Sequence, residues 1–161
     1  MTEICYTDSP VGRLTLAARE GRITGLWLEK QKHYGAGLPA DAREDPDAAP
    51  FAQAREWLRG YFAGEAPDPT GLPLAPQGTA FQRRVCEALR QIPYGHTVTY
   101  GQLARALDSS PRAVGGAVGC NPISILIPCH RILGADGGLV GYAGGLQNKK
   151  RLLRLEGALA E

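Results

Sequence analysis

The sequence contains no long hydrophobic run and few cysteines. Across its 161 residues, no apolar stretch approaches the roughly 18 residues that cross a bilayer. The opening segment, MTEICYTDSPVGRL, has no signal-peptide core. These absences argue against a membrane or secreted protein and favour a cytoplasmic one, or a nuclear one in a eukaryote. Four cysteines (Cys5, Cys86, Cys120 and Cys129) are too few and too scattered for a disulfide framework, so we expect free thiols.

The composition is that of a globular protein whose two halves differ in charge. Hydrophobic residues make up 43% and charged residues 21%, a balance that argues against disorder. Residues 1–75 hold 8 Lys and Arg against 11 Asp and Glu, a net charge of −3. Residues 76–161 hold 10 against 5, a net charge of +5. The second half therefore favours a polyanionic partner, although an uneven solvated surface explains the charge equally well.

A linker composition separates the two halves. Residues 64–78 contain four prolines and three glycines, which indicates a boundary between domains at 1–75 and 76–161. Before it, alternating apolar residues predict strands over 14–18 and 23–28, and helical spacing predicts a helix over 51–62. The first half is thus expected to be a small antiparallel sheet plus one helix, an α/β support domain without a chemical cluster.

The second half is predicted to be mostly α-helical. The expected helices cover residues 79–92, 100–107, 111–119 and 146–156. A capping box at Thr79 and Gln82 begins the first, and Ser110 is the expected N-cap of the third, with Pro111 at its first position. The apolar run 123–127 is interpreted as a buried strand or extended segment.

Residues 99–119 form a helix-turn-helix candidate, because two short helices are joined by a tight turn. The second helix consists almost entirely of small residues, and each interior glycine costs about 1 kcal/mol relative to alanine. Gly115 and Gly116 therefore suggest close approach to something bulky. Arg112 lies in the first turn, where it opposes the helix dipole, and an external anion or base stack would explain it. The alternative is a helix packed tightly inside the protein with Arg112 at the surface.

Cys129 beside His130 is a candidate activated thiol, because a basic neighbour favours the thiolate. Adjacent residues on a strand point to opposite faces, so His130 reaches the sulfur only if the chain turns there or through a water. Glu156, in the last turn of the last helix, is a candidate for orienting a buried histidine. The alternatives are a structural Cys-His pair and a solvent-exposed glutamate.

These motifs together resemble the O6-alkylguanine-DNA alkyltransferases, also called methylated-DNA–protein-cysteine methyltransferases. The resemblance rests on Pro128-Cys129-His130-Arg131, on the preceding segment RAVGGA from Arg112 and on the following YAGG from Tyr142. Residues 8–12 resemble the first turn of the family, so the likeness covers the whole chain. It implies a single-turnover DNA repair protein that flips an alkylated guanine from the duplex and moves the alkyl group from O6 to its own cysteine. O4-alkylthymine is left open as a second substrate.

The resemblance also implies a role for each site residue. Cys129 is the acceptor, His130 the base acting through a water, Glu156 the group that holds His130, and Tyr100 the donor to the ring N3 of guanine. The implied DNA contacts are Arg112 (which replaces the extruded base in the stack), Ala113, Gly116, Tyr100, Asn121 and Arg131. The implied base pocket consists of Val118, Ile132, Tyr142 and the backbone amide of Ala143. Asn121 is also expected to brace the turn between the recognition helix and the active-site segment.

Some positions depart from the family pattern. Many relatives have tryptophan at Cys86, some have methionine at Val118, and some have serine at Ala143. Some relatives hold zinc in the first domain, but only Cys5 matches, so we expect no metal and no cofactor. The expected partner is double-stranded DNA containing O6-alkylguanine, bound by a monomer, with no membrane association. Three alternatives stay open: a non-catalytic lesion binder, a helix-turn-helix regulator and a thiol hydrolase.

Overall fold

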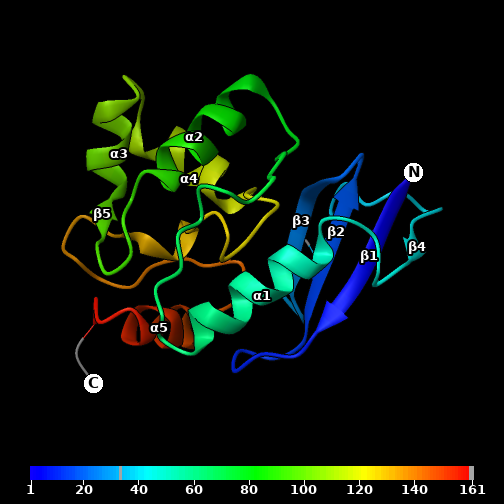
Figure 1. Cartoon of the computed structure of the whole chain (residues 1–161). Coiled ribbons are helices and arrows are strands. Elements are labelled where there is room, and N and C mark those ends of the chain that lie inside the picture. Colours follow the sequence, from blue (N-terminus) through cyan, green and yellow to red (C-terminus); the bar gives the residue numbers. More distant parts are fainter. Residues whose placement is uncertain (33, 160–161) are drawn as a thin grey trace.

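The computed structural model describes residues 1–32 and 34–159, with a sheet at one end and most helices at the other (Figure 1). Three antiparallel strands form the sheet: β1 (Thr2–Thr7), β2 (Leu14–Arg19) and β3 (Arg22–Leu28). A short strand, β4 (Arg43–Glu44), pairs parallel with β1 at the edge. The predicted antiparallel sheet is therefore confirmed, with one parallel strand added.

Helix α1 (Phe51–Phe62) supplies the rest of the first half. Its buried residues include Phe51, Ala54, Leu58 and Tyr61, which recur at helical spacing along one face. In Figure 1, α1 extends from the sheet toward α5 (Leu146–Leu155), the last helix of the chain. This placement brings the end of α1 to the part of the second half that contains Glu156.

The second half is mostly helical, as predicted. Its elements are α2 (Ala80–Arg90), β5 (Val98–Thr99), α3 (Tyr100–Ala106), α4 (Pro111–Gly119), a 3-10 turn at Cys129–Arg131, β6 (Ile132–Leu133) and α5. The predicted caps are confirmed, because Thr79 Oγ1 accepts from Gln82 N at 3.1 Å and Ser110 Oγ accepts from Ala113 N at 3.1 Å. No described helix is long and apolar enough to span a membrane.

Residues 123–127 are buried, as predicted, but they form neither a strand nor an extended segment. Only Ile123 forms a bridge, to Leu26, and the remainder is a turn. The cause is Asn121, whose Oδ1 accepts from Ile123 N at 3.0 Å and whose Nδ2 donates to Ile127 O at 2.9 Å. The Asn121 side chain thus forms hydrogen bonds with the backbone at both ends of the segment and folds it into a turn, in which Ile127 N donates to Ile123 O at 3.0 Å.

The hydrophobic core is continuous across the predicted domain boundary. Strand β3 bonds to the turn after α4, because Leu26 N donates to Pro122 O at 2.9 Å and Ser124 N donates to Leu26 O at 3.1 Å. Part of the proline-rich linker also joins β3, through a bridge between Ile23 and Leu74. The first half therefore holds the turn that leads to Cys129 in place.

Candidate active site

Cys129 lies in a cavity of about 490 Å³ between α4 and the segment 141–143. The cavity is lined by Lys32, Tyr100, Gly115, Gly116, Val118, Gly119, Cys120, Asn121, Ser124, Cys129, Gly141, Tyr142 and Ala143. Its volume falls within the range of about 300–1,000 Å³ that is typical of small-molecule sites. Cys129 is 6% exposed and lines this cavity.

The chain turns at Cys129, so this residue and His130 do not lie on an extended strand. Cys129 N donates to Ile127 O at 2.8 Å, and residues 129–131 form a single 3-10 turn. Cys129, His130 and Arg131 therefore do not alternate across a strand. The cysteine lines the cavity while His130 is fully buried behind it.

The carboxylate of Glu156 is the centre of a buried hydrogen-bond network. Its Oε2 accepts from His130 Nε2 at 2.7 Å, from Tyr61 Oη at 2.5 Å and from Arg131 Nη2 at 3.0 Å. Its Oε1 accepts from Arg131 Nε at 2.7 Å. Burial alone would raise the pKa of Glu156, but the hydrogen bonds from His130 and Arg131 outweigh it and hold the pKa at about 2. Glu156 is therefore ionised and can only accept.

An ionised Glu156 fixes the tautomer of His130. Because the carboxylate only accepts, the 2.7 Å contact requires a proton on Nε2. Burial lowers the pKa of His130, Glu156 opposes this, and the charges of Arg131 and Lys149 lower it further. The resting imidazole is therefore neutral, with a free lone pair on Nδ1, which is buried and has no hydrogen-bond partner among the described residues. His130 is thus prepared to accept a proton at Nδ1.

The thiol itself is held in its neutral form by burial. Burial raises the pKa of Cys129, and this effect is only partly offset by a hydrogen bond from Asn121 and by the positive charge of Lys149. A base and a nearby cation are the two features that make such a thiol reactive. The site supplies the cation in Lys149, and His130, the next residue in the chain, is the candidate base.

Lys149 is a buried cation with no carboxylate within ion-pair distance among the described residues. Its Nζ donates to three carbonyl oxygens: Ile132 at 2.5 Å, Val140 at 3.0 Å and Gly141 at 3.1 Å. Burial lowers its pKa to about 8, and the nearby Cys129 opposes this shift. Lys149 therefore holds the backbone at Val140 and Gly141, where the lining segment 141–143 begins, and places a positive charge near the sulfur of Cys129.

Most of the predicted site residues gather at this cavity or on the adjacent helix. Tyr100, Val118, Asn121, Tyr142 and Ala143 line it with Cys129. Arg112, Ala113 and Gly116 lie on the exposed face of α4. The carbonyl oxygen of Ala143 accepts from Lys32 N at 2.9 Å, which ties the segment to the first half of the chain.

Two predicted residues lie elsewhere. Arg131 was expected to contact DNA, but its guanidinium is buried, paired with Glu156 and bonded through Nη1 to Ile92 O at 2.7 Å. Ile132 was expected in the base pocket, but it is fully buried outside the lining and its carbonyl oxygen is bonded to Lys149. Both residues come shortly after Cys129, and the turn at 129–131 buries their side chains in the core. The predicted DNA contact of Arg131 and the predicted place of Ile132 in the base pocket are therefore wrong.

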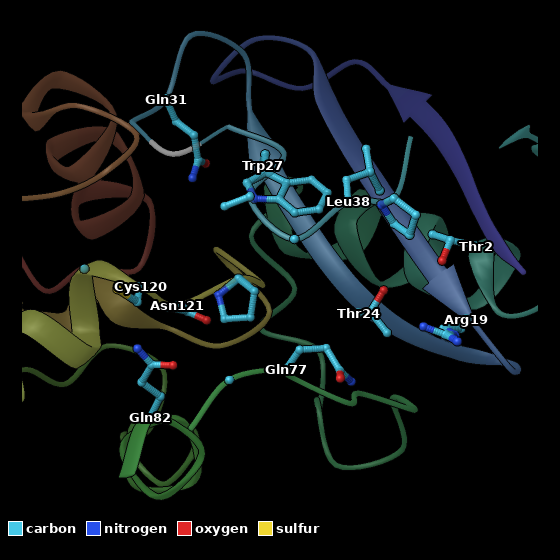
Figure 2. A pocket seen from close by; sticks show the side chains of 16 residues that line it. Thr2, Arg19, Thr24, Trp27, Gln31, Leu38, Gln77, Gln82, Cys120 and Asn121 are labelled. Carbon is cyan, nitrogen blue, oxygen red and sulfur yellow. The ribbon is translucent and has the colours of Figure 1, made fainter. Parts of the chain in front are cut away.

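A second cavity of about 490 Å³ lies between the sheet and the helical half (Figure 2). Its lining includes Arg19, Trp27, Gln31 and Gln82, and it shares residues 119–121 with the first cavity. It contains none of Cys129, His130 and Glu156. Because the candidate nucleophile Cys129 and the candidate base His130 lie elsewhere, we take the cavity at Cys129 as the candidate active site.

Sequence reasoning missed Tyr61, which belongs to the Glu156 network, and Lys149, whose charge acts on Cys129. A signal for Lys149 was present, because Lys149, Leu152, Leu153 and Glu156 share the helical spacing of one face. All four are buried in the structure. A lysine and a glutamate on an apolar stripe indicate a buried polar site. Tyr61 gave no comparable signal, since an aromatic residue on a core-facing helix is ordinary.

The fold and the site together define a helix-turn-helix protein with a thiol active site. Two family models match the chain: the ribonuclease-like domain of 6-O-methylguanine DNA methyltransferase over residues 4–76, and the DNA binding domain of the same family over residues 80–158. The chain therefore belongs to the 6-O-methylguanine DNA methyltransferase family.

Individual relatives agree over nearly the full length. The chain is 46% identical over 160 residues to the methylated-DNA–protein-cysteine methyltransferase of Haemophilus influenzae, covering 97% of this chain and 88% of the relative. For the protein of that name from Mycolicibacterium paratuberculosis, the identity is 46% over 158 residues, with coverage of 97% and 93%. The crystal structure of Mycobacterium tuberculosis OGT in complex with DNA matches with a TM-score of 0.86 at 42% identity, covering 97% of this chain and 93% of that chain.

Replacing Lys149 with methionine should lower the reactivity of Cys129. The variant keeps side-chain length but removes the charge, so the pKa of the thiol rises and its thiolate fraction at neutral pH falls. We expect a several-fold slower reaction with iodoacetamide at pH 7, and a rate profile displaced to higher pH. The measurement is peptide mapping of modified Cys129 over time. Lys150→Met is the matched control, and equal profiles for the two variants would contradict the assignment.

Proposed function

We propose that this chain repairs DNA by direct reversal of damage, as a single-turnover methylated-DNA–[protein]-cysteine S-methyltransferase. It transfers the alkyl group of O6-alkylguanine irreversibly to Cys129. The observation that carries the proposal is a cysteine that lines a cavity of about 490 Å³ and is followed by a histidine bonded to a buried glutamate. Relatives of the same name support it, and a structure of one solved relative contains DNA.

The proposed reaction is a displacement at carbon. The thiol proton passes through a water to Nδ1 of His130, whose Nε2 proton is held by Glu156. The sulfur of Cys129 then forms a bond to the alkyl carbon as the bond from that carbon to O6 breaks. Tyr100 donates its hydroxyl proton to N3 of the departing guanine, so the base leaves neutral. The product is S-alkylcysteine, which no residue of the site reverses, so each chain reacts once.

The proposed DNA contact is the exposed face of α4. At Gly116 and Gly119 there is open space where a Cβ atom would lie, so packing within the protein does not require glycine there. Small residues on an exposed helix suit close approach to sugar and phosphate in a narrow groove. Arg112 at the start of this helix is exposed and takes the place of the extruded base. We propose double-stranded DNA as the partner of a monomeric chain.

The alternative functions make different predictions. A non-catalytic lesion binder does not need the nucleophile, yet Cys129 is present with a prepared base. A helix-turn-helix regulator requires side chains that read base edges, whereas the outer face of α4 presents mainly alanine and glycine after Arg112. A thiol hydrolase would turn over many times on an ester or peptide. The geometry favours alkyl transfer over all three.

The central test is transfer of a labelled methyl group from duplex DNA containing O6-methylguanine. We expect the label on Cys129 at no more than one equivalent per chain, and none in Cys129→Ala. Cys120 lines the same cavity and is exposed, so Cys120→Ala is the matched control and should transfer normally. Label on another residue, or repeated turnover, would defeat the proposal. Mass spectrometry of the peptides locates the label.

Tyr100→Phe and Arg112→Ala should separate chemistry from base extrusion. Without its hydroxyl donor, Tyr100→Phe should slow transfer by about a hundredfold or more with little change in DNA affinity. Arg112→Ala should slow repair in duplex DNA more than reaction with the free base, because only the duplex requires extrusion. Single-turnover rates and binding titrations measure both. Equal losses of Arg112→Ala on the two substrates, or a Tyr100→Phe defect in affinity alone, would overturn these roles.

A further inference from the structure

The first half of the chain contributes a hydroxyl group to the network that holds His130. Tyr61 lies on α1 and is fully buried, and its Oη donates to Glu156 Oε2 at 2.5 Å. The same oxygen accepts from His130 Nε2 at 2.7 Å. Arg131 Nη2 also donates to this oxygen, at 3.0 Å, so Tyr61 and His130 share the electron density of one carboxylate oxygen with the guanidinium.

The hydroxyl is held in place by an aromatic cluster. The ring of Tyr61 stacks on Trp57 at 5.2 Å and meets the edges of Phe62 at 5.1 Å and Tyr94 at 6.0 Å. These ring contacts do not involve the hydroxyl group, so phenylalanine at position 61 would pack equally well. The tyrosine oxygen is thus not explained by packing, and its only recorded partner among the described residues is the carboxylate that orients the base.

We propose that Tyr61 is a positioning residue of the alkyl-transfer site, which acts through Glu156 to set the basicity of His130. This inference rests on the proposed function. A hydroxyl that donates to Oε2 reduces the negative charge that this oxygen offers to the Nε2 proton. The imidazolium form of His130 is then stabilised less, and the neutral base persists at lower pH. The first half of the chain therefore contributes to catalysis in addition to its support of the fold.

The sign of the effect of Tyr61→Phe follows directly. Without the hydroxyl, Oε2 accepts more strongly from His130 Nε2, which favours the imidazolium. The base is then lost to protonation at a higher pH than in the wild type. Tyr61→Phe should therefore transfer several-fold more slowly than wild type at the acid end of the pH range, with a ratio that approaches one as the pH rises. A purely structural defect would lower the rate by the same factor at every pH.

A spectroscopic measurement tests the inference without alkylated DNA. The Nε2 proton of His130 in 15N-histidine protein should resonate further downfield in Tyr61→Phe, because its hydrogen bond to Glu156 strengthens. Site-specific 3-fluorotyrosine at position 61 is a stronger donor in the same packing and should move the resonance upfield. Substitution of His33 and His96 assigns the signal. If wild-type protein transferred no alkyl group, the proposed function would fail while this measurement still tested the coupling.

Tyr94→Phe is the matched control. It removes a hydroxyl from the same aromatic cluster, but Tyr94 Oη donates at 3.2 Å to the backbone oxygen of Leu155. It should leave both the His130 resonance and the pH dependence of the transfer rate unchanged. The inference is supported if Tyr61→Phe and 3-fluorotyrosine move the resonance in opposite directions. It is overturned if neither moves it relative to Tyr94→Phe, and the fluorinated protein decides the matter should Tyr61→Phe not fold.

Discussion

One buried carboxylate holds the active site together. Glu156 accepts hydrogen bonds from three side chains that come from distant parts of the chain: Tyr61 on α1, and His130 and Arg131 in the turn after the cysteine. A buried ion is costly unless it is paired with an opposite charge and hydrogen-bonded. Glu156 has both, through the charge of Arg131 and the hydrogen bonds from all three side chains. The charge on Arg131 keeps Glu156 ionised, and the ionised carboxylate keeps the proton of His130 on Nε2. The free lone pair on Nδ1 follows from that arrangement.

Because Arg131 neutralises Glu156, His130 faces an ion pair and not an isolated negative charge. The imidazolium is therefore stabilised only moderately, and the resting site contains a neutral thiol beside a neutral base. This state suits a protein that reacts once, since a permanently ionised thiolate is also the form most exposed to oxidation. Lys149, near the sulfur, favours the thiolate when the proton leaves. The site therefore combines a neutral resting thiol with an unpartnered ring nitrogen on His130.

Much of the fold was predictable because its signals are local. The capping residues Thr79 and Ser110 and the helical periodicities depend only on neighbouring residues, and the structure confirms them. The turn at 123–127 was not predictable, because its apolar residues match a buried strand and only the long-range role of Asn121 folds it otherwise. Likewise, the family motif identified the residues of the cavity but misplaced Arg131, because sequence adjacency to the cysteine does not reveal which way a side chain turns. The contribution of Tyr61 depends on a contact across 95 positions, which no local pattern encodes.

The most direct test of this account is the single-turnover transfer rate of Glu156→Gln. The variant keeps the shape of the side chain but loses its charge, so its amide can donate to His130 Nε2 and move the ring proton to Nδ1, where it blocks the base. Unpaired Arg131 will lower the stability, so the rate is measured on protein shown to be folded by calorimetry, with the exposed Glu87→Gln as control. The account predicts a loss of about two orders of magnitude or more at neutral pH. A folded Glu156→Gln protein that transferred methyl groups within a few-fold of the wild-type rate would contradict it.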